Sequence, residues 1–316
     1  MTRRASLPLR HRPFVWDAAI ALLACIGIGG VMLGLWLSAI AVSLSFFLAL
    51  LLLFFGSFIE PKRIHLNTKV VRISDLPDLT IAVTADFHIG PFKRRIFLRR
   101  IVSRLNALRP DLIVLPGDFL FDSDTRVDDL EALNALRAPL GVFAVLGNHD
   151  SGQHMWNGKH LQTADRSADV QRLLEQCGIT VLRNQARALT HKGQSFAIAG
   201  IDDLWMPSSD LQQALASVPD AMPLLLLSHN PDVVLHPAHV RAALIISGHT
   251  HGGQFRLPII GSLAPIPSAT GCTFDQGICS LASGTMLAVT HGIGETMCRA
   301  RLFCPPEILV LRNTTD

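Results

Sequence analysis

Five short polar motifs follow one another along the chain, and their residue types suit the binding of metal ions. They are Asp86-Phe87-His88, Gly117-Asp118, Gly147-Asn148-His149-Asp150, His229 and Gly248-His249-Thr250-His251-Gly252. Two aspartates, one asparagine and four histidines in these motifs are candidate ligands, and His149 remains as a spare imidazole. Imidazole and carboxylate groups bind Mn, Zn and Fe alike. The motifs therefore predict a site for two divalent ions, whose identity the residue types leave open.

A pair of metal ions suits the hydrolysis of phosphate esters. Two ions roughly 3.5–4 Å apart make a bridging water acidic enough to attack as hydroxide, and they clamp the phosphoryl oxygens. A carboxylate can bridge the ions through its two oxygens. Each motif alone also has an ordinary structural explanation: Asp-x-His can be a turn, Gly-Asp can cap a helix, and a lone histidine can be buried in the core. Their joint occurrence favours a two-metal hydrolase.

An apolar run precedes each motif and has the character of a buried β-strand. The five runs are 80–85, 111–116, 141–146, 224–228 and 242–247. Short apolar runs bounded by turns are typical of strands covered on both faces. In open α/β sheets, ligands bind outside the carboxyl ends of the strands. We therefore expect the five motifs to face one crevice.

With these motifs the chain resembles the calcineurin-like metallophosphoesterases, and in particular a membrane-tethered bacterial branch of small phosphohydrolases. The family pattern of D-x-H, GD, GNH(D/E), H and GHxH is complete here. Segments that resemble the branch are 58–61, 200–205, 228–232, 252–254 and 304–308. The resemblance extends over about residues 58–312. It implies a four-layer α/β/β/α sandwich with the metal site along one edge.

The resemblance also implies a role for each motif residue. One metal ion would be held by Asp86, His88, Asp118 and His251. The other would be held by Asp118, Asn148, His229 and His249, so that Asp118 bridges the two. His149 would face the substrate as a proton donor or a transition-state stabiliser, and Asp150 would orient its imidazole. His291, where relatives more often carry Arg or Gly, is a candidate substrate contact.

The substrate is less well indicated than the reaction. A membrane tether favours a lipid-linked phosphodiester or pyrophosphate, and a UDP-diacylglucosamine type of pyrophosphate is one candidate by resemblance. Trp156, Trp205, Met155 and Met206 could form an apolar lip for acyl chains, or could simply pack. Segment 151–178 could cap the site. One alternative is a general phosphodiesterase acting on soluble nucleotides or cell-envelope polymers.

A second alternative is a membrane scaffold with a structural metal site. Structural sites are closed and fully ligated by protein, and the spare imidazole of His149 favours catalysis instead. The sequence contains no nucleic-acid-binding motif, and it does not indicate an oligomeric state. His154, His160 and His191 lie outside the motifs and are expected at the surface.

The first sixty residues predict a membrane segment. No Asp, Glu, Lys or Arg occurs between residues 18 and 59. As one helix this run of about 42 residues would be roughly 63 Å long, about twice the hydrocarbon thickness. Two spans at 17–37 and 40–59 fit, and a single tilted span is the alternative. The expected organisation is a basic amino terminus at 1–16, the membrane segment at 17–60, a linker and edge strand at 61–78, and the catalytic domain at 79–316.

The charges beside this segment bear on its orientation. Arg3, Arg4, Arg10 and Arg12 precede it, and Lys62 and Arg63 follow it. Basic flanks prefer the cytoplasm, so two spans would keep the catalytic domain at the cytoplasmic face of the inner membrane, whereas one span would export it. Six cysteines without a C-x-x-C pair indicate free thiols in a reducing compartment.

A basic cluster and three helices complete the prediction. Helical stretches are expected at 92–108, 128–137 and 165–177. The first carries Lys93, Arg94, Arg95, Arg99 and Arg100. These cations could form a solvated helix face, or could attract anionic lipid head groups or a phosphate-bearing substrate.

Overall fold

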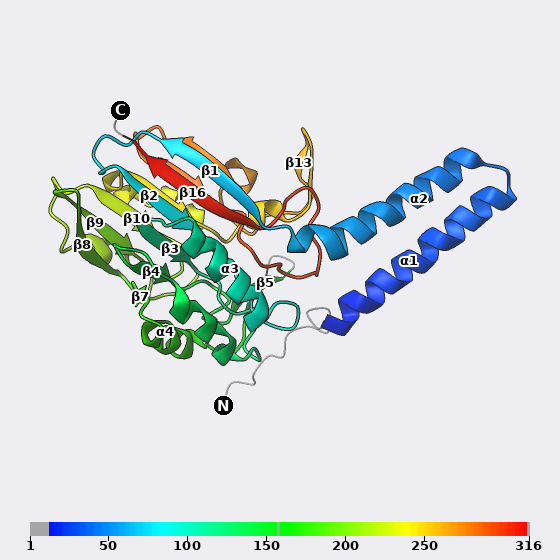
Figure 1. The fold of residues 1–316 in the computed structure, drawn as a ribbon, viewed down its shortest axis with the longest axis horizontal. Helices are drawn as coiled ribbons and strands as arrows, with labels where there is room; N and C mark the ends of the chain where they lie inside the picture. Colours follow the sequence, from blue (N-terminus) through cyan, green and yellow to red (C-terminus); the bar gives the residue numbers. More distant parts are fainter. Residues whose placement is uncertain (1–12, 157–158, 315–316) are drawn as a thin grey trace.

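A globular part and a long pair of helices make up the structure, which is a computed structural model describing residues 13–156 and 159–314 (Figure 1). Helix α1 (Pro13–Trp36) and helix α2 (Ile40–Phe54) run antiparallel and extend away from the globular part. A π-helical turn (Phe55–Ile59) and a 3-10 turn (Glu60–Lys62) continue α2 into the globular part. Both helical segments, Phe14–Trp36 and Ile40–Lys62, are long and apolar enough to cross a membrane.

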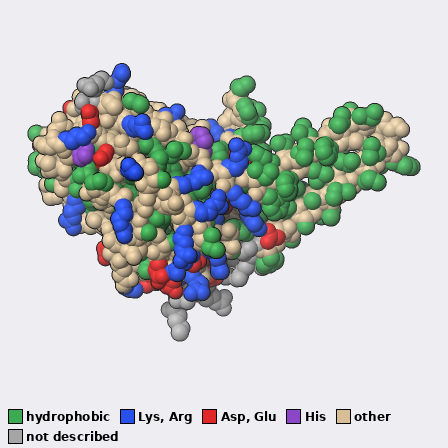
Figure 2. Space-filling model, in the orientation of Figure 1, with side chains coloured by type: hydrophobic (Ala, Val, Ile, Leu, Met, Phe, Trp, Pro, Cys, Tyr) green, Lys and Arg blue, Asp and Glu red, His purple; other side chains and the backbone are tan. Residues whose placement is uncertain are grey.

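The packing of α1 against α2 depends on glycine. A Cβ atom at Gly30 would lie 2.4 Å from the ring of Phe46, and one at Gly34 would lie 2.7 Å from the backbone nitrogen of Ser43. The missing side chains let the helices approach closely, as small residues do between membrane helices. The large apolar side chains face outward instead, and Trp36 is 81% exposed. Hydrophobic side chains cover the helix pair (Figure 2). The two-helix hairpin predicted from the sequence is therefore confirmed.

Two six-stranded sheets form the centre of the globular part. The first has the order β1-β16-β2-β3-β4-β7, with bounds His65–Val71, Glu307–Asn313, Leu79–Val83, Leu112–Pro116, Val142–Val145 and Thr180–Val181. The second has the order β14-β15-β11-β10-β9-β8, with bounds Gly277–Ser280, Met286–Val289, Leu244–Ser247, Leu224–Leu227, Gln194–Gly200 and Gln185–His191. The five apolar runs predicted to be strands form β2, β3, β4, β10 and β11.

The sheets pack face to face, and helical segments cover their outer faces. Buried side chains such as Val114, Leu225 and Ile246 fill the space between the sheets. Helices α3 (Arg95–Ala107) and α4 (Ser167–Gln176) pack on the outer face of the first sheet. Helix α5 (Leu211–Leu215) and the 3-10 segments η5 (Pro231–Leu235) and η6 (Pro237–Arg241) lie on the second. The predicted four-layer α/β/β/α sandwich is confirmed.

One predicted helix has 3-10 geometry. Residues 128–137 were expected to be helical, and the chain forms a 3-10 helix there, η4 (Val127–Ala135). Its apolar side chains Val127, Leu130 and Leu133 recur every three residues and pack in the core with Leu136. A helix with 3.0 residues per turn places such a series on one face, whereas an α-helix would spread it around the axis.

Candidate metal centre

The five motifs meet at the seam between the two sheets. Asp86, Asp118 and the 147–150 motif follow β2, β3 and β4 of the first sheet. His229 and the 248–252 motif follow β10 and β11 of the second. The chain turns sharply at these strand ends. Five of the seven candidate ligands have a positive φ, between 42° and 69°: Asp86, His88, Asp118, His249 and His251. Such backbone is uncommon outside glycine and clusters at functional sites.

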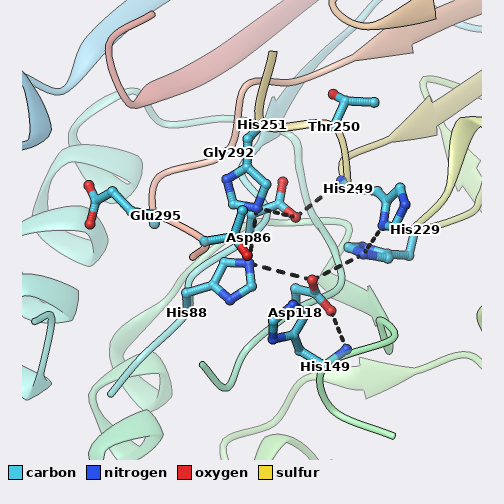
Figure 3. A network of polar contacts seen from close by, with 12 residues as sticks. Asp86, His88, Asp118, His149, His229, His249, Thr250, His251, Gly292 and Glu295 are labelled. Atoms are coloured by element: carbon cyan, nitrogen blue, oxygen red, sulfur yellow. Dashed lines mark hydrogen bonds and ion pairs between the residues drawn. The ribbon is translucent and has the colours of Figure 1, made fainter. Parts of the chain in front are cut away.

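The first group of candidate ligands consists of Asp86, His88 and His251 (Figure 3). Their ligand atoms all lie within 4.8 Å of one another. Nε2 of His88 is 3.0 Å from Nε2 of His251, and Nε2 of His251 is 3.8 Å from Oδ1 of Asp86. Burial lowers the pKa of both imidazoles well below its usual value, so two neutral rings face each other. Neutral imidazole is the form that binds a metal ion.

The second group consists of Asn148, His229 and His249. Nδ1 of His249 lies 3.0 Å from Oδ1 of Asn148 and 3.2 Å from Nε2 of His229. The other ring nitrogens donate to backbone carbonyls: Nδ1 of His229 to Pro116, at 2.7 Å, and Nε2 of His249 to Pro267, at 2.9 Å. Such outer hydrogen bonds fix which nitrogen carries the proton. They leave Nε2 of His229 and Nδ1 of His249 aimed at the same point.

Asp118 lies between the two groups. Its Oδ2 atom is 3.5 Å from Nε2 of His88 and 3.3 Å from Nε2 of His229. Its Oδ1 atom accepts a hydrogen bond of 2.9 Å from the amide of His149. Although burial favours the neutral acid, the imidazoles of His229 and His149 hold the pKa of Asp118 well below its usual range. An ionised carboxylate with one oxygen toward both groups is suited to bridging two cations.

The pKa values of the buried groups at this centre indicate that it can accommodate additional positive charge. Burial raises the pKa of Asp86 to about 7, although His229 opposes this. The buried Oδ2 atom of Asp86 has no hydrogen-bond partner among the described residues. Against the effect of burial, Asp118 raises the pKa of His229 to about 10, so that an imidazolium balances the carboxylates. Burial also lowers the pKa of His249 to about 4. The donor set therefore fits divalent cations. These would neutralise the aspartates in place of the proton on His229.

His149 stands beside the metal ligands and lines the pocket next to them. Its Nδ1 atom lies 2.7 Å from the carbonyl oxygen of Phe121, and its ring meets the ring of His88 edge to face. Asp150 was expected to orient this imidazole. The carboxylate of Asp150 accepts instead from the amides of Phe119, Leu120 and Gly147. Asp150 therefore shapes the loops around the site, and the partner of the imidazole is a backbone carbonyl.

A pocket of about 360 Å³ opens from this centre. Asp118, Asn148, His149, His249 and His251 belong to its polar end. Its walls are largely apolar and include Met155, Trp205, Ile266, and Val15, Trp16 and Ala19 of α1. The base of the helix pair therefore lies directly beside the metal centre.

The predicted substrate contacts have different positions. Trp205 lines the pocket, and its ring meets the ring of His249 edge to face at 5.0 Å between centroids. Trp156 ends strand β5 (Gln153–Trp156), but its side chain lies outside the described part of the structure. His291 is not among the described residues that line this pocket. It packs near Glu307, whose Oε1 atom accepts from its amide at 2.9 Å.

Two residues of the site region differ from the sequence-based expectation. His154 was expected at the surface, but it is buried, lines the pocket and meets the ring of His149 edge to face. It belongs to β5, which pairs with β6 (Lys159–Gln162), and that pairing has no local signature in the sequence. Lys93 was counted among the basic residues of a helix surface. It is also buried, and its Nζ atom lies 2.6 Å from Oε1 of Glu295.

The motifs at this centre fall within one known sequence family. The profile of the calcineurin-like phosphoesterases matches residues 79–253, more than half of the chain, and this range contains every candidate metal ligand. The chain belongs to the calcineurin-like phosphoesterase family. Members of this family use a dimetal centre, and this calcineurin-like phosphoesterase is a metal-dependent phosphoesterase.

Three proteins to which this calcineurin-like phosphoesterase is similar come from bacteria. An uncharacterized metallophosphoesterase of Bacillus subtilis, YkuE, is 30% identical over 264 residues, covering 81% of this chain and 87% of that protein. The UDP-2,3-diacylglucosamine pyrophosphatase LpxG of Chlamydia trachomatis is 26% identical, with coverage of 76% and 85%. The phosphodiesterase YaeI of Escherichia coli is 30% identical, with coverage of 73% and 80%.

Proposed function

We propose that this phosphoesterase hydrolyses a phosphoester or pyrophosphate bond in a lipid-linked substrate at the membrane. The observation that supports this most is the composition of the pocket. Its polar end contains Asp118 and His149. Its apolar wall includes Trp16 of α1, a helix long and apolar enough to cross a membrane. A substrate with a phosphate group at one end and acyl chains at the other matches both parts.

In this proposal the seven motif ligands hold two divalent ions of Mn, Zn or Fe. Asp86, His88 and His251 would hold one ion, Asn148, His229 and His249 would hold the other, and Asp118 would be shared by both groups. Bound there, the ions supply a nucleophile at neutral pH and relieve the charge on the phosphoryl oxygens. The protein contributes the fixed orientation of the imidazoles, which the carbonyls of Pro116 and Pro267 support.

His149 is proposed to handle the leaving group. The Phe121 carbonyl accepts from Nδ1, so Nε2 is the ring nitrogen left available to the leaving group. A protonated Nε2 facing the pocket can donate to the departing oxygen or stabilise its developing charge. The proposed role of Asp150 is indirect, through the loops that carry Asp118 and His149.

A relative supports the substrate class. LpxG is named for a pyrophosphate that carries two acyl chains, and such a molecule has the polar and apolar parts that the pocket accommodates. We propose a substrate of this kind here.

We further propose that the helix pair spans the inner membrane twice, with both ends and the catalytic domain in the cytoplasm, because basic residues flank it on both sides.

The experiment compares matched substrates. The full-length protein is assayed in mixed micelles with Mn, Zn or Mg, using an acylated nucleotide-sugar pyrophosphate, its deacylated analogue, and bis(p-nitrophenyl) phosphate. We expect preferential cleavage of the acylated compound. Equal kcat/KM for the acylated and deacylated forms would contradict the lipid-linked substrate and favour a general phosphodiesterase.

A further inference from the structure

A small apolar hairpin projects from the globular part near the base of the helix pair. Strands β12 (Arg256–Leu257) and β13 (Gly261–Ser262) pair antiparallel, and residues 258–260 form the turn. Ile259 at the tip is fully exposed, and Ile260 is 71% exposed. In the space-filling view the tip forms a separate hydrophobic protrusion beside the helix pair (Figure 2). No charged residue occurs between Arg256 and Asp275.

The tip is unusual for a turn in water. Ile259 has a φ of 73°, a conformation that strains a β-branched side chain. Glycine or asparagine would serve such a turn without strain. Strained residues persist where their surroundings or function require them. Here a large apolar side chain occupies the strained position at full exposure, which indicates that its contact lies outside the described chain.

The hairpin belongs to the same face as the helix pair. It lies on the side of the globular part from which the helices extend (Figure 1). The amide of Arg256 donates to the carbonyl of Leu302 at 2.9 Å. The next amide, that of Phe303, donates to Oε2 of Glu60 at the end of the helix pair, also at 2.9 Å. Met297 and Phe303 in the same loop region are about half exposed.

We propose that the β12–β13 hairpin is a third membrane contact, whose tip at Ile259 and Ile260 inserts into the boundary between lipid head groups and acyl chains. The inference rests on the membrane anchoring in the proposed function. Insertion is shallow, because the unpaired backbone groups of a turn need the polar part of the bilayer. The bilayer is the occupant because the tip is apolar and exposed, lies on the side of the globular part from which the helix pair extends (Figure 1), and carries no charge that a protein partner would pair.

The root of the hairpin connects this contact to the metal centre. Arg256 donates from its guanidinium to the carbonyl of Gly252, 2.7 Å away, and pairs with Asp275. Gly253 packs so closely on Ser262 that an added Cβ would lie 2.5 Å from the Cβ of Ser262. After β13 the chain continues directly into the pocket wall at Ala264 and Ile266. Insertion of the tip would therefore hold the pocket at the level of the lipid phosphates.

Photo-crosslinking tests the contact without depending on activity. The full-length protein is reconstituted in vesicles of phosphatidylethanolamine and phosphatidylglycerol, with p-benzoylphenylalanine placed singly at Ile259, Leu48 or Val70. Leu48 lies on α2 and is 57% exposed. Val70 is a matched exposed apolar residue, 64% exposed, near the end of β1 that lies away from the helix pair. We expect phospholipid adducts at 259 and 48 and none at 70.

Each other result identifies what has failed. Adducts at 48 without adducts at 259 overturn the hairpin proposal and leave the anchor intact. Crosslinks between two protein chains at 259 also overturn it, because the tip would then be a protein interface. The absence of adducts at both positions would contradict the membrane anchor itself, and the hairpin contact with it.

A second measurement uses activity. An Ile259→Asp/Ile260→Asp variant should lose turnover of a vesicle-embedded substrate while cleaving bis(p-nitrophenyl) phosphate normally, whereas Val70→Asp should retain both activities.

Discussion

The Oδ2 atom of Asp118 lies 3.3 Å from Nε2 of His229, and the same oxygen faces Nε2 of His88 at 3.5 Å. These two histidines come from different sheets, β2 preceding His88 and β10 preceding His229. One carboxylate therefore joins the two halves of the candidate metal centre. Its second oxygen is held by the His149 amide, so Asp118 is not free to rotate away from either group.

Asp118→Asn should remove metal as well as activity. An amide keeps the shape of the side chain but loses the negative charge that balances two cations. We expect elemental analysis to find fewer than two ions per chain and turnover to fall to background. Asp124→Asn, an exposed change in the following loop, should keep both. Two bound ions in the Asp118→Asn protein would contradict the bridging role.

His149→Ala should separate chemistry from metal binding. The imidazole points into the pocket and is held by Phe121, so we expect the metal content to persist. Turnover should fall by roughly 10²–10⁴, the usual contribution of acid–base assistance. The loss should be smaller for a nitrophenyl ester, whose leaving group needs no proton. Equal losses with good and poor leaving groups would refute the proton-donor role.

Asp203→Asn should change how stability depends on pH. Burial raises the pKa of Asp203 from 3.8 to about 6. The folded protein therefore takes up a proton that the unfolded chain releases, so this contribution is present below about pH 4 and is lost as pH rises through 6. Asparagine cannot ionise and can still accept from the Trp205 amide.

The measurement is the free energy of unfolding of the metal-free proteins across pH 4–8. Relative to the wild type, Asp203→Asn should gain up to about 3 kcal/mol over this range. Exposed Asp210 provides a control that lacks the burial, because Asp210→Asn keeps a side-chain oxygen that can accept from the Gln213 amide. Parallel stability curves for wild type and Asp203→Asn would show that Asp203 stays ionised.

The convergence of the candidate metal ligands could be predicted from the sequence, because each candidate lies just after the end of a strand. An apolar run followed by a polar motif indicates both the strand and the edge at which the side chain emerges. The contacts that complete the site join distant segments instead. Phe121 and His149 are 28 residues apart, and Lys93 and Glu295 are 202 apart. Only tertiary packing brings such pairs together, so no local sequence pattern predicts them.

The contribution of α1 to the apolar wall of the pocket could not be predicted either, because it too depends on contacts between distant segments. The sequence indicated an apolar helix near Trp16, but its position beside the metal centre depends on how the helix pair meets the globular part. Glu60 contributes to that junction, since its carboxylate accepts from the amides of Phe303 and Cys304. The 3-10 geometry of η4 could have been predicted, because the spacing of Val127, Leu130 and Leu133 by three was already visible.

Glu60→Ala should weaken the junction between the helix pair and the catalytic domain. Glu60 is buried, and its removal leaves two backbone amides without an acceptor. Each unsatisfied buried group costs about 1–3 kcal/mol, so the thermal midpoint in detergent should fall clearly. Glu60→Gln retains one acceptor oxygen, so its thermal midpoint should lie between those of the wild type and Glu60→Ala. An unchanged midpoint for Glu60→Ala would mean that water reaches these amides.

A reporter fused after Asp316 should reveal the side of the membrane on which the catalytic domain lies. The two helices each have the length of one span, and Lys62 and Arg63 follow the second. Two spans return these basic residues to the side of the amino terminus, whereas a single span would carry them and the catalytic domain across. We therefore expect fluorescence from a reporter that folds only in the cytoplasm. A phosphatase reporter that works only after export should remain inactive; its activity would place the catalytic domain, and hence its substrate, on the opposite face.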